Sequence, residues 1–328
     1  MTARRLTTSD ADLDLAAAAL RRGELVGMPT ETVYGLAGNA LDPATVAAIF
    51  AAKGRPGFDP LIVHALDRQS AFELSDAPPE AAVRLAEAFW PGPLTLVVPR
   101  TALVPDLAAA GLPTVALRVP AHPVARELLR RSGLRLAAPS ANPFGGVSPT
   151  TAEHVLAGLG GVIGWVVDAG ACERGLESTV VSFETGEPTI LRHGALPMEA
   201  IEARVGRVSE GARVLERPLA PGQLARHYAP RVALRLSESA AALPGPAPDA
   251  GLLVCVGPAP AGASRWGHVE CLSPEGQIEV AASRLFAALH HLDTLGLSRV
   301  DVLLPSDAGL GRAMRDRLRR AAVRSADG

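Results

Sequence analysis

The chain carries a single lysine, and that lysine stands beside an arginine in a loop rich in glycine and proline. In the segment KGRPGFDPLIVH (53–64), Lys53 comes two residues before Arg55. An ammonium is a compact point charge and a guanidinium is a planar bidentate donor, so the two together suit phosphate oxygens. A cation at the end of a helix is also favoured by the helix dipole, which offers a purely structural alternative for Lys53. Because that alternative does not account for Arg55, we favour a phosphate-binding site.

Further polar side chains lie where short apolar runs end. The segment PTETVYGLAGNA (29–40) carries Thr30, Glu31 and Thr32. The segment RLAAPSANPFGGVSPTT (135–151) carries Ser140, Asn142 and Ser148. Three more stand singly at strand ends: Arg118, Ser178 and Arg192. In open α/β sheets, ligands bind beyond the carboxyl ends of the strands. Turn and capping residues explain each segment equally well when it is taken alone. Their joint position at strand ends indicates a polar binding site.

The motifs of several common chemistries are missing from the sequence. Lys53 follows AIFAA rather than a glycine-rich phosphate loop, and GLGGVIG (158–164) misses the dinucleotide spacing by one residue. There is no H-E-x-x-H, C-x-x-C or G-x-S-x-G motif. His268 and Cys271 could form half of a metal site, but no second ligand pair accompanies them, so we expect no metal site in the protein. Aromatic residues make up 4% of the chain, which disfavours a surface that stacks nucleic-acid bases.

Alternation of apolar runs and helical patterns predicts an α/β fold with a mixed sheet. Ser9 and Asp42 are typical N-caps for helices over 10–22 and 43–53, and Gly54 ends the second. Other helices are expected near 79–90, 122–132, 150–159 and 275–295, with a last one ending near 323. Strands are expected at 24–28, 61–65, 94–99, 114–119, 135–139, 165–169, 179–183, 189–192, 232–236, 251–256 and 300–305.

Length and composition favour a two-domain cytosolic protein. The 328 residues exceed the usual size of one core, and 48% apolar with 20% charged residues is ordinary for a globular chain. A net charge of −2 argues against a broad surface for polyanions. No apolar run is long enough to cross a membrane, the N-terminus has no signal-peptide core, and three scattered cysteines suit a reducing compartment. We assign 1–205 to a first domain, 206–232 to a linker and 233–328 to a smaller α/β domain.

These segments resemble the YrdC-like family, specifically its long, two-domain threonylcarbamoyl-AMP synthases. The matching stretches are PTETVYGL, KGRPGFDPLIVH, FWPGPLTLV, ALRVP, APSAN, GLESTVV, ILRHG and APGQLARHYAP. The resemblance implies a twisted mixed sheet with helices, a linker that forms a flap over the active site, and a Rossmann-like C-terminal domain. Two positions depart from the family's usual pattern: Asp59 stands where asparagine is frequent, and Ala220 stands where serine is frequent.

The resemblance also implies a reaction and a role for each site residue. Such enzymes condense L-threonine, bicarbonate or CO2, and ATP into threonylcarbamoyl-adenylate and release pyrophosphate, and a separate transferase complex passes the group to tRNA. The threonine and bicarbonate pocket would comprise Thr32, His64, Arg118, Ala138 and Ser178. The ATP contacts would comprise Lys53, Arg55, Asp59, Thr114, Ser140, Asn142, Ser148, Arg192 and Tyr228, or His227 beside Tyr228. Lys53 and Arg55 would be catalytic, and Mg2+ would arrive with ATP, because few carboxylates fall in the motifs.

Two other functions remain open from the sequence. One is an RNA-binding module, since the related single-domain fold is associated with double-stranded RNA. The other is a carbamoyl-transfer domain of the hydrogenase-maturation type, although the acylphosphatase region and zinc-finger cysteines of those proteins are absent here. Direct tRNA binding is left undecided by the near-neutral charge.

Overall fold

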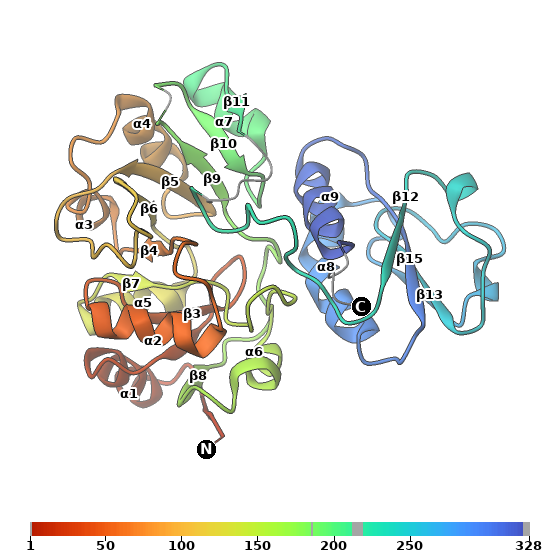
Figure 1. Ribbon diagram of the computed structural model, residues 1–328, viewed down its shortest axis with the longest axis horizontal. Coiled ribbons are helices and arrows are strands. Elements are labelled where there is room, and N and C mark those ends of the chain that lie inside the picture. The colour runs from red at the N-terminus through yellow and green to blue at the C-terminus, as the bar shows by residue number, and fades with distance from the viewer. Residues whose placement is uncertain (1, 185, 212–218, 324–328) are drawn as a thin grey trace. The chain divides into compact units, whose positions relative to one another are not determined.

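The structure, a computed structural model, describes residues 2–184, 186–211 and 219–323, which divide into two compact units (Figure 1). Unit 1 comprises Met1–Phe144, Ser148–Glu173 and Glu177–Leu224. Unit 2 comprises Gly145–Val147, Arg174–Leu176 and Ala225–Gly328. The division after residue 224 falls inside the segment 206–232 that we assigned to the linker.

Unit 1 is built around one mixed sheet. Its strands are β1 (Arg4–Leu6), β2 (Val26–Met28), β3 (Gly35–Asn39), β4 (Ile62–His64), β5 (Leu94–Pro99), β6 (Thr114–Arg118), β7 (Leu136–Ala137), β8 (Trp165–Val167), β9 (Thr179–Ser182), β10 (Thr189–Arg192) and β11 (Ser209–Glu210). They pair in the order β1-β8-β2-β3-β7-β4-β6-β5-β9-β10-β11. The sheet contains parallel pairs such as β4–β6 and antiparallel pairs such as β5–β6, which confirms the mixed sheet.

Most helices of unit 1 begin and end close to where the sequence signals predict. The helices are α1 (Asp10–Arg21), α2 (Pro43–Lys53), α3 (Arg68–Phe72), α4 (Glu80–Phe89), α5 (Pro123–Ser132), α6 (Ala152–Leu159) and α7 (Met198–Val205). Ser9 accepts a hydrogen bond from the amide of Asp12 and caps α1, and Asp42 caps α2 in the same way. Gly54 ends α2 in the left-handed conformation at φ 62°. The short helices α3 and α7 have no counterpart among the predicted helices.

Strand β3 lies in the segment that the sequence suggests is a turn. Its residues, GLAGN, have low strand propensity, so no strand was predicted there, and the alternative of a turn does not hold for the second half of the segment. Close packing explains the glycines. A Cβ atom at Gly38 would lie 2.6 Å from a methyl group of Thr45 on α2, and one at Gly35 would lie 2.9 Å from the Cβ of Ala138. The strand is therefore determined by its neighbours rather than by its own residues.

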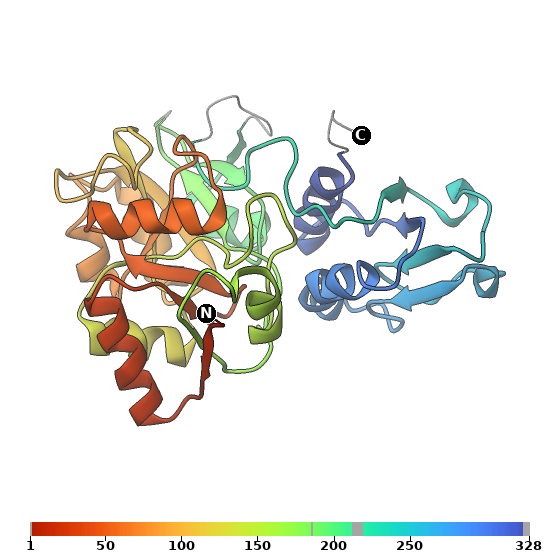
Figure 2. The same ribbon diagram turned by 60° about the horizontal axis from the view of Figure 1, so that its bottom comes forward.

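Alternation along the strands separates the two faces of this sheet. One face packs against α2, α4, α6 and α7, and the other packs in part against α1 and α5 (Figure 2). Val63 belongs to the first face, so Ile62 and His64 belong to the second. On that second face, a smaller cluster is covered by the linker residue Ala220: Ile62, Val97, Ala116, Val180 and Leu191.

Unit 2 contains a four-stranded parallel sheet among the residues described. Its strands β12 (Leu234–Ser237), β13 (Ala250–Val254), β14 (His268–Cys271) and β15 (Arg299–Leu303) pair in the order β12-β15-β13-β14. The helices are α8 (Ile278–Leu292) and α9 (Leu310–Ala321), with short 3-10 turns η1 (Ala240–Ala242) and η2 (Ala263–Arg265). Strand β14 was not predicted, because HVEC is short and carries two polar side chains. No helix in the described ranges has the length and apolar character that a membrane span requires.

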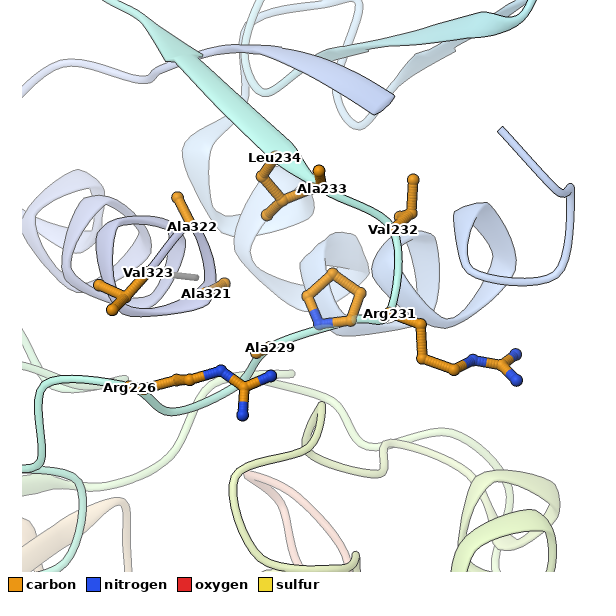
Figure 3. Close-up of a pocket in the computed structure, with 10 residues that line it drawn as sticks. Arg226, Ala229, Arg231, Val232, Ala233, Leu234, Ala321, Ala322 and Val323 are labelled. Atoms are coloured by element: carbon orange, nitrogen blue, oxygen red, sulfur yellow. The ribbon is translucent and has the colours of Figure 1, made fainter. Parts of the chain in front are cut away.

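A pocket of about 270 Å3 lies within unit 2 (Figure 3). It is lined by residues of the segment before β12 and of the end of α9: Arg226, Ala229, Pro230, Arg231, Val232, Ala233, Leu234, Ala321, Ala322 and Val323. None of the residues assigned to substrate from the sequence lines this pocket.

Candidate functional site

Lys53 joins two segments that are far apart in the sequence. It is the last residue of α2 and only 4% of its surface is exposed. Its Nζ donates to the carbonyl oxygens of Ser140 and Asn142 at 2.5 and 2.6 Å, and its own carbonyl accepts from the amide of Phe144 at 2.8 Å. Burial, followed by the nearby Arg55, holds the pKa of Lys53 well below its usual value. The buried amino group of Lys53 thus lies directly against the Ser140–Asn142 turn.

Arg55 and Asp59 form a buried pair one loop further on. The Nη2 of Arg55 lies 2.9 Å from Oδ2 of Asp59, and the guanidinium also donates to the carbonyl oxygens of Asp59 and Pro60. Asp59 is fully buried, and burial raises its pKa above the usual value even though Arg55, Lys53 and Arg192 each lower it. Three basic side chains, two from the same segment as Asp59 and one from β10, therefore act on a single carboxylate.

A second buried pair connects the end of β6 to the segment after β2. Arg118 donates through Nη2 to Oε1 of Glu31 at 2.6 Å and to Oγ1 of Thr32 at 2.9 Å. Burial alone would raise the pKa of Glu31, but the Arg118 guanidinium outweighs it, and the pKa lies below its usual value. The second carboxylate oxygen of Glu31 is buried with no hydrogen-bond partner among the described residues. The guanidinium of Arg118 is thus held in place beside a carboxylate, that of Glu31, which lacks one of its hydrogen bonds among the described residues.

His64 lies on the same face of the sheet as Arg118. Register pairs the two residues on adjacent parallel strands. Burial, followed by the charge of Arg118, lowers the pKa of His64 to about 3, so the imidazole is neutral at physiological pH. Within the described ranges its Nδ1 is buried without a partner. A neutral imidazole of this kind can donate or accept a hydrogen bond without adding charge.

Ser178 and Arg192 meet at the neighbouring strands β9 and β10. The Nη2 of Arg192 donates to the carbonyl of Ser178 at 2.8 Å and to its Oγ at 3.1 Å. The register of β10 shifts between Ile190 and Arg192, which indicates a bulge. Because Ile190 faces the core of α4 and α7, strict alternation would turn Arg192 to that face as well; the bulge turns it to the site face.

Other residues assigned from the sequence are buried around these pairs. Ser148 donates to Oε1 of Glu177 at 2.6 Å, and Thr114 lies on the face of Arg118, four residues earlier on β6. Ala138 follows β7, and its amide donates to the carbonyl of Ile62 at 3.2 Å.

Tyr228 lies in unit 2, apart from the unit that holds the other site residues. It is buried and has a φ of 61°, and its ring stacks on Phe286 with centroids 5.6 Å apart. The Cζ of Arg317 lies 4.9 Å from the centre of the Tyr228 ring. Its assignment to ATP stays a prediction.

Three buried polar residues that the motifs did not assign lie beside the site residues or in the linker. Thr95 shares the site face of β5 with Val97, and its hydroxyl lies 2.8 Å from that of Ser178. Glu177 binds Ser148, as described above. Gln223 in the linker is fully buried, accepts from the amides of Leu219 and Ala220, and has no partner for Nε2 within the described ranges. Period-two alternation in LTLVVP could have identified Thr95, whereas nothing local distinguishes Gln223.

Both domains match known protein families. Residues 18–194 match the Sua5, YciO and YrdC family model, described as telomere recombination, and residues 196–323 match the model described as threonylcarbamoyl-AMP synthase, C-terminal domain. The mixed sheet, the buried cations and this pair of matches define the class: the chain belongs to the Sua5/YciO/YrdC family, in its two-domain form.

Particular relatives are similar over nearly the whole chain. A threonylcarbamoyl-AMP synthase of Pyrococcus abyssi is 39% identical over 326 residues, covering 94% of this chain and 93% of the relative. One of Bacillus subtilis is 41% identical over 331 residues, covering 97% and 94%. The crystal structure of P. abyssi Sua5 complexed with L-threonine superposes with a TM-score of 0.88 at 35% identity and covers 98% of both chains.

Proposed function

We propose that this protein synthesises threonylcarbamoyl-AMP from L-threonine, bicarbonate or CO2, and ATP, with release of pyrophosphate. The observation that carries the proposal is the geometry of Lys53, which lies against the Ser140–Asn142 turn, and of Arg55, which pairs with buried Asp59, because two basic groups so placed suit a polyphosphate. The similarity to threonylcarbamoyl-AMP synthases, and to a structure with L-threonine bound, supports it.

Arg118 is suited to hold the carboxylate of threonine. Its guanidinium is already ordered by Glu31 and Thr32, so a substrate carboxylate meets a positioned donor. Neutral His64 beside it leaves the substrate amine free of a competing charge. The neutral amine then attacks CO2: the C–N bond forms while one C=O π bond of CO2 opens onto oxygen, and the nitrogen passes one proton to water to give the carbamate.

The second step is an in-line displacement at the α-phosphate of ATP. A carbamate oxygen forms the new O–P bond, the bond to the β-phosphate oxygen breaks, and pyrophosphate leaves with the electron pair. Negative charge on the phosphoryl oxygens is stabilised by Lys53 and Arg55, so catalysis consists of positioning and electrostatics. In the described part of unit 1, no group of three metal-ligating side chains occurs, and we infer that Mg2+ comes with the ATP phosphates and neutralises part of their charge.

Residues 219–221 of the linker act as a cover over part of the site face of the sheet. Ala220 packs on the apolar cluster of that face, and the carbonyl of Pro221 accepts from Arg192 at 3.2 Å. Exclusion of water protects a carbamate and a mixed anhydride from hydrolysis. A chain ending at residue 216 should therefore release pyrophosphate more slowly with threonine than the full chain does. Gln223→Ala, which keeps the segment, should show a smaller loss; unchanged kinetics in the truncated chain would contradict the cover.

The direct test is mass spectrometry of the products formed from threonine, 13C-bicarbonate and Mg-ATP. The proposal expects an adenylate whose mass includes threonine and one labelled carbon, together with pyrophosphate, and neither without threonine. Binding of tRNA without any threonine-dependent adenylate would instead support the RNA-binding alternative. Passage of the product to a tRNA threonylcarbamoyl transferase complex is part of the same proposal.

A further inference from the structure

Unit 2 brings together two histidines and a glutamate that have no part in the proposed synthesis. His268 and Glu270 lie on β14, and His291 lies in the last turn of α8. Oε2 of Glu270 is 3.3 Å from Nδ1 of His291 and 3.6 Å from Nε2 of His268. One ligand atom from each of the three lies within 4.8 Å of the others.

The register of the sheet explains why these three side chains meet. Strand β14 is the edge strand, and it pairs in parallel with β13 so that His268 lies beside Gly251 and Glu270 beside Leu253. That face carries α8, since a Cβ atom at Gly251 would lie 3.7 Å from a methyl group of Leu292. The last turn of α8 therefore places His291 over the two β14 side chains.

The same register excludes Cys271, the partner considered from the sequence. Cys271 is one residue beyond Glu270 and points to the opposite face, where it packs with Leu252 and Val254. The half-site suggested by His268 is thus completed by Glu270 and His291. Nothing in the sequence spacing links His291, 23 positions further along, to this pair.

Two imidazoles and one carboxylate form a donor set for late first-row divalent metals. Zinc bonds to nitrogen and oxygen of about 2.0–2.2 Å place tetrahedral ligand atoms roughly 3.3–3.6 Å apart. The two distances to Glu270 match this spacing. Within the described ranges, Nε2 of His268 is buried and makes no hydrogen bond.

We propose that His268, Glu270 and His291 bind a divalent transition-metal cation, with Zn2+ the expected ion, and leave one coordination position for water. The metal fastens the edge strand β14 to the end of α8 and so stabilises unit 2. A salt-bridge cluster without metal is the alternative, but partly exposed ion pairs of this kind contribute little. This proposal replaces the expectation that the protein has no metal site.

Calorimetric titration of ZnCl2 into the full, untagged, chelator-treated chain tests the proposal. We expect one Zn2+ per chain and an affinity at least ~10-fold weaker in His268→Ala, Glu270→Gln and His291→Ala. Zn2+ should raise the Tm of the native chain and of the control variants but not that of these three ligand variants. His290→Ala is the matched control, since the neighbouring side chain points about 100° away around the helix, and Cys271→Ser is the control on the strand.

Co2+ in place of Zn2+ adds a spectroscopic readout that reports direct ligation of the metal rather than the stability of unit 2. The native chain should show the visible absorption of tetrahedral Co2+, which His291→Ala loses and His290→Ala keeps. Circular dichroism without metal establishes that each variant is folded. The proposal is overturned if the native chain shows no saturable binding below millimolar Zn2+, or if the three ligand variants bind as tightly as the native chain.

Discussion

Replacing Lys53 by methionine tests the proposed phosphate site most directly. The side chain is 4% exposed and its Nζ contacts the carbonyl oxygens of Ser140 and Asn142. Methionine fills a similar volume without the charge, so the variant removes the ammonium without opening a large cavity. The chain holds no other lysine that could substitute for it.

The expected loss follows from the electrostatics of a buried donor. A unit charge about 3 Å from a phosphoryl oxygen, at an effective dielectric constant near 20, contributes at most roughly 5 kcal/mol. Measured losses of one donor to a developing oxyanion are about 2.7–4 kcal/mol. We therefore expect turnover to fall by about 100- to 1,000-fold.

The assay is threonine-dependent release of pyrophosphate from Mg-ATP. Arg21→Met is the matched control, because Arg21 also ends a helix but is exposed and lies outside the site. That variant loses the same interaction with a helix dipole and should keep near-native turnover. If Lys53→Met retained turnover within tenfold of the native chain, or if Arg21→Met lost as much, the phosphate role would be refuted.

The lowered pKa of Lys53 gives the same variant a second readout. Nearby phosphate charge favours the ammonium, so ATP raises this pKa from its depressed value in the free protein. Between the two pKa values, binding must take up a proton. Calorimetry in buffers of different ionisation enthalpy should detect that uptake in the native chain and find it reduced in Lys53→Met; equal uptake in both would contradict the assignment.

Three further predictions concern the threonine side of the site. Arg118→Lys keeps the charge but loses the planar guanidinium that reaches Glu31 and Thr32. We expect KM for threonine to rise about 10- to 100-fold, with a smaller change in KM for ATP. Equal changes in both KM values would contradict the role of Arg118. Thr95→Val removes the hydroxyl beside Ser178 and should weaken threonine binding by about 1 kcal/mol, seen as a several-fold rise in KM for threonine. Thr101→Val is the control: its hydroxyl has no partner in the described structure, so KM should hardly change. His64 has a pKa of about 3, so its imidazole stays neutral as the pH falls through 6.5, and the pH profile of kcat/KM should show no limb there; a limb near 6.5 that disappears in His64→Gln would refute this.

Much of the secondary structure could be predicted from local pattern. Ser9, Asp42 and Gly54 mark helix ends because caps act within one turn of the chain. Apolar runs such as LTLVVP predict strands for the same local reason. The glycine-rich strand β3 was missed because its conformation depends on the close approach of α2 and Ala138, which no propensity records.

Sequence by itself determined which residue types are available: one ammonium, the Ser140–Asn142 turn, and arginines at strand ends. Only the tertiary structure decided which of them meet, because contact depends on register and face. A bulge in β10 turns Arg192 toward the site, and parallel pairing of β14 with β13 turns Glu270 rather than Cys271 toward His291. Successive side chains along a strand point to opposite faces of the sheet, so one extra residue or one step of register moves the following side chains to the other face. Packing between distant segments decides which register forms.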